Sequence, residues 1–192
     1  MANKKNFRVY YLLLNEGTAE ANLFAYLTKN RFRALFDGSN VQFSNKVEII
    51  KDDNQIVSQG KLDGVSDLKH FKSKHILIKE KYAGQRLFYF LDKDMDDSLA
   101  IEKLIIKDGD LIQFAEYNSE HLLLRLAGKN PKNPANFKNL SAFRAYCKRE
   151  FKKQFKKEAH QFKDADFELV FNVPTEDEVK ASLSILFSTL EQ

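Results

Sequence analysis

Two short apolar runs, each followed at once by acidic residues, limit the folds available to this chain more than any other feature. The first run closes the segment Phe7–Leu14 and leads into Glu16, and the second is Leu87–Leu91 and leads into Asp92 and Asp94. A continuous apolar run bounded by turn residues is typical of a strand buried on both faces, as in a parallel sheet covered by helices. Ligands of such sheets bind at the carboxyl ends of the strands. We therefore expect these three carboxylates to meet at one edge of a sheet.

Around these runs the pattern alternates between strands and helices. Alternation of this kind favours an α/β fold with a mostly parallel sheet and helices on both faces. The segment 76–78 fits either a helix or a strand. The other elements that we expect are a helix from Thr18 that ends near Asp37, strands at 47–50 and 111–117, and helices through 65–71, 99–106 and 120–126.

The chain changes character after Gly128, which is a natural helix stop. The segment 129–134 is a polar, proline-bearing linker. Beyond it we expect helices over 140–162 and 175–190, the second of which starts with a Thr-x-x-Glu capping box. We therefore divide the chain into a Rossmann-like α/β domain, residues 1–128, and a mainly helical, basic C-terminal extension, residues 129–192.

Composition excludes several classes of protein. Of the 192 residues, 43% are hydrophobic, which is enough for a packed core. No apolar run is long enough to span a bilayer, and the polar, basic start of the chain does not resemble a signal peptide. The single cysteine, Cys147, excludes an intramolecular disulfide framework and argues against a cysteine-rich zinc site. We expect a cytoplasmic protein that does not bind membranes.

Carboxylates that converge repel one another, so a hard divalent cation, Mg²⁺ or Mn²⁺, is expected among them. Asp92 and Asp94 alternate along the chain and share a side, so both can face one ion. Glu20 lies about one helical turn beyond Glu16, and Asp96 follows in the loop. The alternative is that these are ordinary surface groups, with Glu16 complementing a helix dipole and Asp96 capping the next helix.

The order strand, Glu-Gly, helix, then strand, Asp-x-Asp, resembles the Toprim domain of topoisomerases, DnaG-type primases and overcoming-lysogenization-defect (OLD) nucleases. The resemblance spans roughly residues 7–128, and it matches Glu16, Asp92 and Asp94 to the family's invariant glutamate and Asp-x-Asp. The segment Glu16–Glu20 also resembles the Glu-Gly-x-x-Glu form of OLD-type bacterial defence proteins, in which the second glutamate joins the metal site. One departure is Met95-Asp96-Asp97, where a small residue or glycine often follows the motif.

A second segment extends this resemblance. Glu116–Leu123 is similar to the acidic helix start after the fourth strand in Toprim-like defence proteins of the RloB and AriB kind. The resemblance implies that Glu120 is a further metal ligand. No Walker-type Gly-x-x-x-x-Gly-Lys-Ser/Thr motif is present in the sequence, so any ATP-driven sensing would come from a partner ATPase or sensor chain.

The resemblance implies a Mg²⁺-dependent nuclease that hydrolyses phosphodiesters of DNA or RNA, tRNA included, in bacterial antiviral defence. Glu16, Glu20, Asp92 and Asp94 would hold one or two ions, with Asp96 as a further candidate. These ions would neutralise the charge that develops as a phosphodiester is displaced in line. Lys93 is the nearest lysine in sequence that could assist catalysis, although its side chain should point away from those of its neighbours.

The extension carries a run of cations that is suited to a nucleic-acid backbone. Such a run is as often only the solvated face of a helix. The residues that we expect to bind nucleic acid are Arg144, Lys148, Arg149, Lys152, Lys153 and Lys156.

Two other functions remain open. The first is a Toprim-like effector or scaffold that depends on a partner and has little activity alone. The second is a phosphatase that acts on small molecules, since an Asp-x-Asp motif also occurs in phosphatases of the haloacid-dehalogenase type. The sequence also leaves open whether the chain forms a homo-oligomer.

Overall fold

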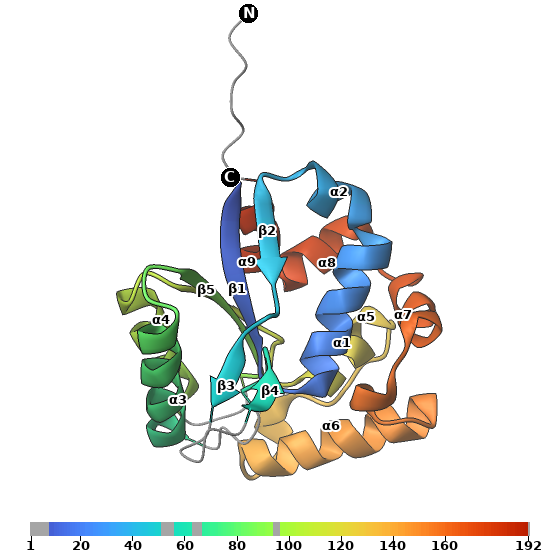
Figure 1. The fold of residues 1–192 in the computed structure, drawn as a ribbon. Coiled ribbons are helices and arrows are strands. Elements are labelled where there is room, and N and C mark those ends of the chain that lie inside the picture. The colour runs from blue at the N-terminus through green and yellow to red at the C-terminus, as the bar shows by residue number, and fades with distance from the viewer. Residues whose placement is uncertain (1–7, 51–55, 63–66, 94–96, 192) are drawn as a thin grey trace, which may run out of the picture.

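The computed structural model describes residues 8–50, 56–62, 67–93 and 97–191. Its centre is a four-stranded, all-parallel sheet (Figure 1). The strands lie in the order β2-β1-β5-β6, with bounds β1 Val9–Asn15, β2 Val41–Ser44, β5 Arg86–Leu91 and β6 Leu111–Phe114. A separate antiparallel hairpin is formed by β3 (Glu48–Ile50) and β4 (Ile56–Gln59). The expected α/β fold is therefore confirmed.

The two central strands are apolar over most of their length because both of their faces are covered there. In β5, Leu87 and Tyr89 belong to one hydrophobic cluster, whereas Phe88 and Phe90 belong to the other. Successive side chains of a strand point to opposite faces, so each cluster receives every second residue. The continuous apolar runs of β1 and β5 therefore reflect burial on both faces of the sheet, as the sequence predicts.

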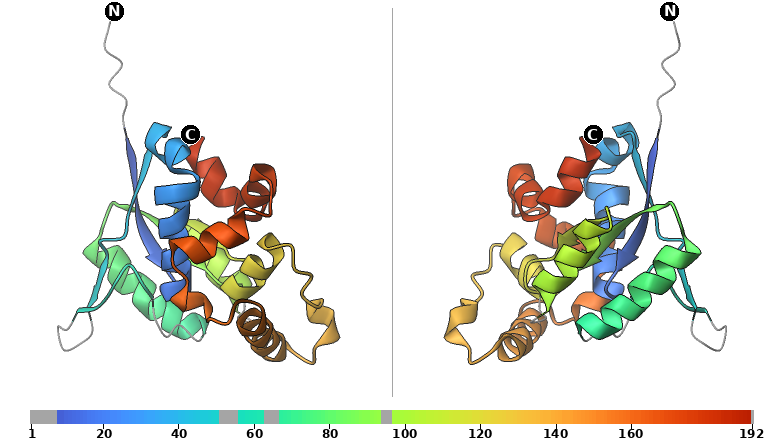
Figure 2. Two further views of the ribbon diagram at one scale, coloured as in Figure 1. Left: turned by 90° about the vertical axis from the view of Figure 1, so that its right-hand side faces the viewer. Right: turned by 90° about the vertical axis from the view of Figure 1, so that its left-hand side faces the viewer.

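Helices cover both faces of the sheet (Figures 1 and 2). One face carries α3 (Leu68–Lys81) and α4 (Ser98–Lys107). The other carries α1 (Thr18–Tyr26) and α5 (Ser119–Leu126), and α1 continues through the π-helical turn η1 (Leu27–Arg31) to α2 (Arg33–Gly38).

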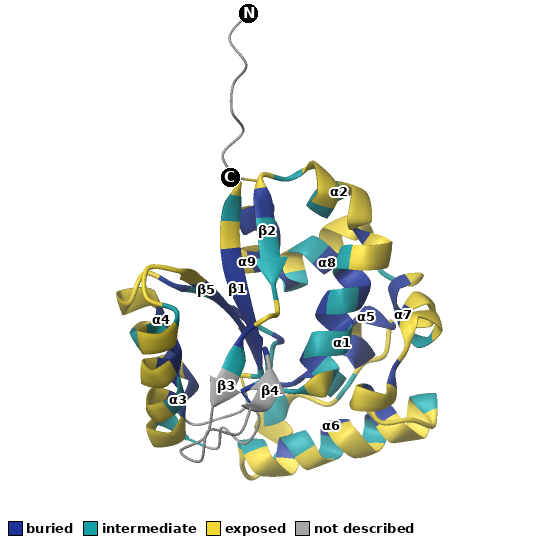
Figure 3. Cartoon of the chain, viewed as in Figure 1, coloured by how far each residue is buried: buried dark blue, intermediate teal, exposed yellow. Residues whose placement is uncertain are grey.

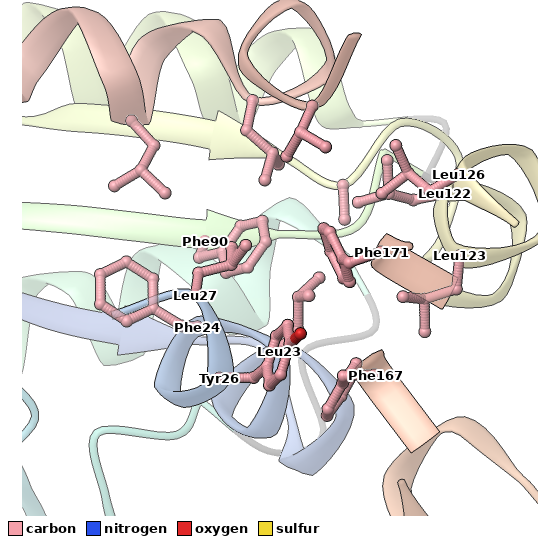
Figure 4. Packing of buried hydrophobic residues seen from close by; sticks show 14 of the residues in the cluster. Leu23, Phe24, Tyr26, Leu27, Phe90, Leu122, Leu123, Leu126, Phe167 and Phe171 are labelled. Carbon is pink, nitrogen blue, oxygen red and sulfur yellow. The ribbon is translucent and has the colours of Figure 1, made fainter. Parts of the chain in front are cut away.

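The C-terminal helices complete the second face. They are α6 (Leu140–Phe155), α7 (Asp164–Phe171), α8 (Glu176–Ser182) and α9 (Ser184–Leu190), with the short 3₁₀ turns η2 (Pro134–Asn136) and η3 (Ala159–Gln161) between them. Phe167 and Phe171 of α7 pack into the same cluster as Leu23 of α1 and Phe90 of β5 (Figure 4). One hydrophobic cluster therefore spans the expected boundary at residue 128.

Several expected elements differ from the structure. The sheet's second strand is β2, whereas the expected strand at 47–50 pairs only with β4. β2 is a four-residue edge strand beside a turn-forming segment, so its apolar signal is short. β6 ends at Phe114, and the segment 76–78 is helical, within α3.

The expected helix over 140–162 ends at Phe155, because Lys156 adopts a left-handed conformation with φ of 59°. The helix α7 was not expected, since its alternating acidic residues weaken the apolar periodicity. In α8, Thr175 and Glu178 form the predicted capping box, with the Thr175 nitrogen 2.7 Å from Glu178 Oε2. In the described part of the chain, no helix is both long and apolar enough to cross a membrane.

Candidate active site at the carboxyl edge of the sheet

The acidic residues lie where the connections of the sheet diverge. From β1 the chain passes to β2 on one side, and later to β5 on the other, so the gap between β1 and β5 is the topological switch point. Asn15 of β1 pairs with Phe90 of β5, so both strands end at the same level. Glu16 and Asp92 follow these ends directly and therefore emerge side by side, as predicted.

Glu16 links the two strand ends. Its backbone nitrogen donates to the Phe90 carbonyl at 3.0 Å, which prolongs the pairing of β1 with β5 by one residue. Its carboxylate Oε2 accepts a hydrogen bond from the backbone nitrogen of Asp92 at 2.9 Å. The Glu16 side chain is therefore held across the switch point rather than extended into solvent.

Glu20 is buried, with only 4% of its surface exposed, at the start of α1. Its Oε2 accepts from the backbone nitrogen of Gly17 at 2.8 Å, and its Oε1 accepts from the hydroxyl of Ser119. Burial of a carboxylate is costly unless hydrogen bonds compensate for the lost water. The first turn of α1 also favours a negative charge, because backbone N–H groups are directed toward it.

Ser119 joins the carboxylates of two elements. Besides Glu20, its hydroxyl lies 3.3 Å from Oδ1 of Asp92. Ser119 is the first residue of α5, whose N-cap Asn118 accepts from the His121 nitrogen at 2.8 Å. The start of α1, the end of β5 and the start of α5 therefore meet at one point. Ser119 was not predicted, since a serine at a helix start is ordinary in sequence.

Three further residues of the predicted site are Asp94, Asp96 and Lys93. Asp94 and Asp96 lie outside the described residues. Lys93 is exposed and places its Nζ 5.4 Å from the ring centre of Phe114. The expected role of Lys93 in catalysis stays a prediction.

Glu120 is half-buried at the start of α5, next to Ser119. Burial, and after it the negative charge of Glu120, raise the pKa of the Cys147 thiol to about 12. Glu120 is therefore close enough to α6 for its charge to act there. Its role as a metal ligand stays a prediction.

The structure adds a lysine that sequence reasoning missed. Residues 60–62 run alongside the end of β1, because Asn15 N donates to the Gly60 carbonyl at 2.7 Å and Leu62 N donates to the Asn15 carbonyl at 2.8 Å. Lys61, between them, places its Nζ 3.2 Å from the hydroxyl of Thr18 at the start of α1. Nothing in the local sequence signals this contact, because it depends on a pairing between segments 46 residues apart.

The donor chemistry of the site fits a hard divalent cation, since Glu16, Glu20 and Asp92 offer only oxygen atoms. Within the described residues, no three His, Cys, Asp or Glu side chains come close enough together to hold a metal ion. Asp94, which belongs to the predicted ligand set, lies outside the described residues. The metal site therefore stays a prediction, supported by the donor type and by the contact of Glu20 and Asp92 with the same hydroxyl, that of Ser119.

The basic helix α6 lies at the same end of the molecule as the carboxyl ends of the strands (Figure 1). It packs through buried Phe143, Cys147 and Phe151, and Phe143 contacts the ring of His121 on α5 at 5.4 Å. Its outer face is exposed (Figure 3). The cations on that face are Lys148, Arg149, Lys152, Lys153 and, at the C-cap, Lys156, whereas Arg144 is half-buried.

Part of this positive charge is neutralised within the chain. Lys152 lies 3.0 Å from Glu158, and Lys153 lies 3.8 Å from Glu150. Both lysines remain largely exposed, so these pairs are screened by water and contribute little to stability.

Comparison of the chain with protein-family models, with curated proteins and with solved structures finds no significant match. Inferences about its chemistry therefore depend on the residues themselves.

Proposed function

We propose that this chain is a Mg²⁺- or Mn²⁺-dependent nuclease of Toprim-like type that hydrolyses phosphodiesters of DNA or RNA. The observation that supports it most is the meeting of Glu20, Asp92 and Ser119, from three separate elements, at the switch point of a parallel sheet. Carboxylates gathered at such a point are costly to maintain unless they bind a cation or substrate. The resemblance of the motifs to bacterial defence nucleases suggests a cytoplasmic role in antiviral defence.

The residues of the chain have distinct roles in this proposal. Glu16, Glu20 and Asp92, with Asp94, hold the cation. When bound, the cation supplies charge neutralisation for the phosphodiester under attack. Ser119 fixes the orientation of Glu20, and the backbone contact between Glu16 and Asp92 fixes the spacing of the two strand ends.

The positive groups bind the substrate. Lys61, together with the N-terminal N–H groups of α1, provides a positive site for a phosphate beside the carboxylates. The exposed face of α6 binds flanking phosphates without regard to base sequence. Because these contacts are with phosphates, the same exposed face of α6 would bind DNA and RNA alike.

The test is a cleavage assay on plasmid DNA, single-stranded DNA and total tRNA, with Mg²⁺ or Mn²⁺. We expect the wild type to cleave at least one substrate and Asp92→Asn to lose this activity, because the neutral amide weakens cation binding. Asp37→Asn is the matched control, since Asp37 is 70% exposed in an ion pair with Arg33, remote from Asp92. Silence of a folded wild type that binds Mn²⁺ would contradict the nuclease and favour the partner-dependent effector.

A further inference from the structure

Beside the acidic site lies a group of aromatic side chains that the proposal above does not use. Phe143 of α6 is fully buried, and three half-buried rings surround or extend from it. Tyr117 lies 5.1 Å and Phe137 5.3 Å from the Phe143 ring centre, and Tyr146 lies 5.0 Å from Phe137. We call Tyr117, Phe137 and Tyr146 the aromatic surface.

This surface begins next to the carboxylates. Tyr117 precedes Ser119 by two residues in the loop that leads from β6 to α5. Its ring also lies 5.1 Å from that of His121 in an edge-to-face arrangement. The aromatic surface is therefore connected along the chain to Ser119, whose hydroxyl contacts Asp92.

One cation contacts the aromatic surface, and two more follow its rings or that of Phe143 in sequence. Lys132 places its Nζ 5.9 Å from the ring centre of Tyr146, and its backbone nitrogen donates to the Tyr146 hydroxyl at 3.1 Å. Exposed Lys138 follows Phe137 directly, and half-buried Arg144 follows Phe143. Half-exposed rings among flexible cations suit a partner that carries both flat apolar groups and negative charges.

We propose that the aromatic surface binds an unpaired stretch of nucleic acid, whose bases stack on these rings while Lys132, Lys138 and Arg144 contact its phosphates. Only unpaired bases can leave their own stack and lie against protein side chains, which is how single strands are commonly bound. A duplex presents phosphates and groove edges instead, so it would use the exposed face of α6 alone. The inference deepens the proposed nuclease by naming its substrate as single-stranded, but binding can be measured without cleavage.

A purely structural explanation is that these rings only fasten the segment 129–139 to α6. Phe143, which is 0% exposed, serves that purpose in either case. The two explanations differ in what happens when an outer ring is replaced by an apolar side chain without a flat face. The packing of the segment 129–139 against α6 would largely survive such a replacement, whereas the stacking of a base on the ring would be lost.

The experiment is fluorescence anisotropy with labelled single-stranded DNA, single-stranded RNA and the corresponding duplexes, in EDTA so that no cleavage occurs. We expect the wild type to bind at least one single strand about tenfold more tightly than its duplex. Tyr146→Leu and Phe137→Leu should each weaken that binding by about tenfold, and Tyr146→Phe should retain it, since the ring remains. Tyr10→Leu is the control, because Tyr10 is 58% exposed on β1, far from α6.

Equal affinity of the wild type for single strand and duplex would overturn the inference. So would equal affinities of Tyr146→Leu, Phe137→Leu and Tyr10→Leu for the single strand, with melting temperatures that show all three to be folded. Selective single-strand binding by a protein that cleaves nothing would contradict the nuclease but leave this inference intact.

Discussion

At the residue scale, Ser119 matters because its hydroxyl contacts two carboxylates of the site, those of Glu20 and Asp92. It supplies one of the two hydrogen bonds that the structure shows for the buried carboxylate of Glu20, and it also lies 3.3 Å from Asp92. A buried carboxylate that loses a donor loses the compensation for its desolvation. Ser119 is thus important both for folding and for the orientation of the carboxylates.

We predict that Ser119→Ala lowers the free energy of unfolding by about 1–3 kcal/mol, because Glu20 Oε1 loses this donor. Denaturant unfolding in EDTA measures the change without interference from bound cations. Ser73→Ala is the control, since the exposed Ser73 bonds back to the Lys69 carbonyl on its own helix, α3, and should change stability by less than about 0.5 kcal/mol. Equal stability of both variants would show that Ser119 does not support Glu20.

The buried thiol of Cys147 gives a prediction about pH. Burial and the charge of Glu120 raise its pKa from 9.0 to about 12, so the thiol ionises more easily in the unfolded chain than in the folded one. Its contribution to stability is therefore complete below pH 9 and is lost as pH rises toward 12. The free energy of unfolding should fall more steeply over this range in the wild type than in Cys147→Ala. Parallel pH profiles of the two proteins would contradict the raised pKa.

At the element scale, the segment 60–62 shows how the sheet positions a cation. Gly60 has φ of 65°, and a Cβ on it would lie 2.8 Å from the Asn45 carbonyl oxygen. Both observations require glycine, because other residues rarely adopt this φ and the contact is with backbone. The close approach allows Lys61 to lie alongside the end of β1 and to reach Thr18.

We predict that Gly60→Ala destabilises the protein by about 2 kcal/mol or more, from the strained φ together with the displaced backbone. Gly84→Ala is the matched control, since Gly84 also has a positive φ, of 78°, but open space around it. Its cost should be about 1 kcal/mol, from backbone conformation alone. Comparison of the two denaturation midpoints measures the effect, and equal losses would mean that the Asn45 contact does not matter.

How well the sequence predicts an element depends on how that element is buried. β1 and β5 are covered on both faces, so their apolar runs are continuous and were predicted. β2 is a short edge strand with one buried residue, Val41, and its pattern does not differ from that of a loop. The break after Phe155 depends on a left-handed Lys156, and the sequence does not signal it because residues other than glycine rarely adopt this conformation.

At the scale of the whole molecule, the position of Glu16 and Asp92 was predictable because parallel strands end at a common edge. Ser119 and Lys61 were not, since each reaches the site through pairing or packing between segments far apart in sequence. The sequence also does not reveal that α7 to α9 complete one face of the sheet. That follows from the side chains that they add to the cluster around α1.

The central claim is that the carboxylates at this edge bind a divalent cation. Titration of the metal-free protein with Mn²⁺, followed by electron paramagnetic resonance, tests it directly in wild type, Glu20→Gln and Glu80→Gln, where Glu80 is exposed on α3. We predict that the wild type and Glu80→Gln bind alike and that Glu20→Gln binds at least about tenfold more weakly, because it loses a charged oxygen ligand. Absence of binding by the wild type, or equal affinity in all three proteins, would contradict the metal site.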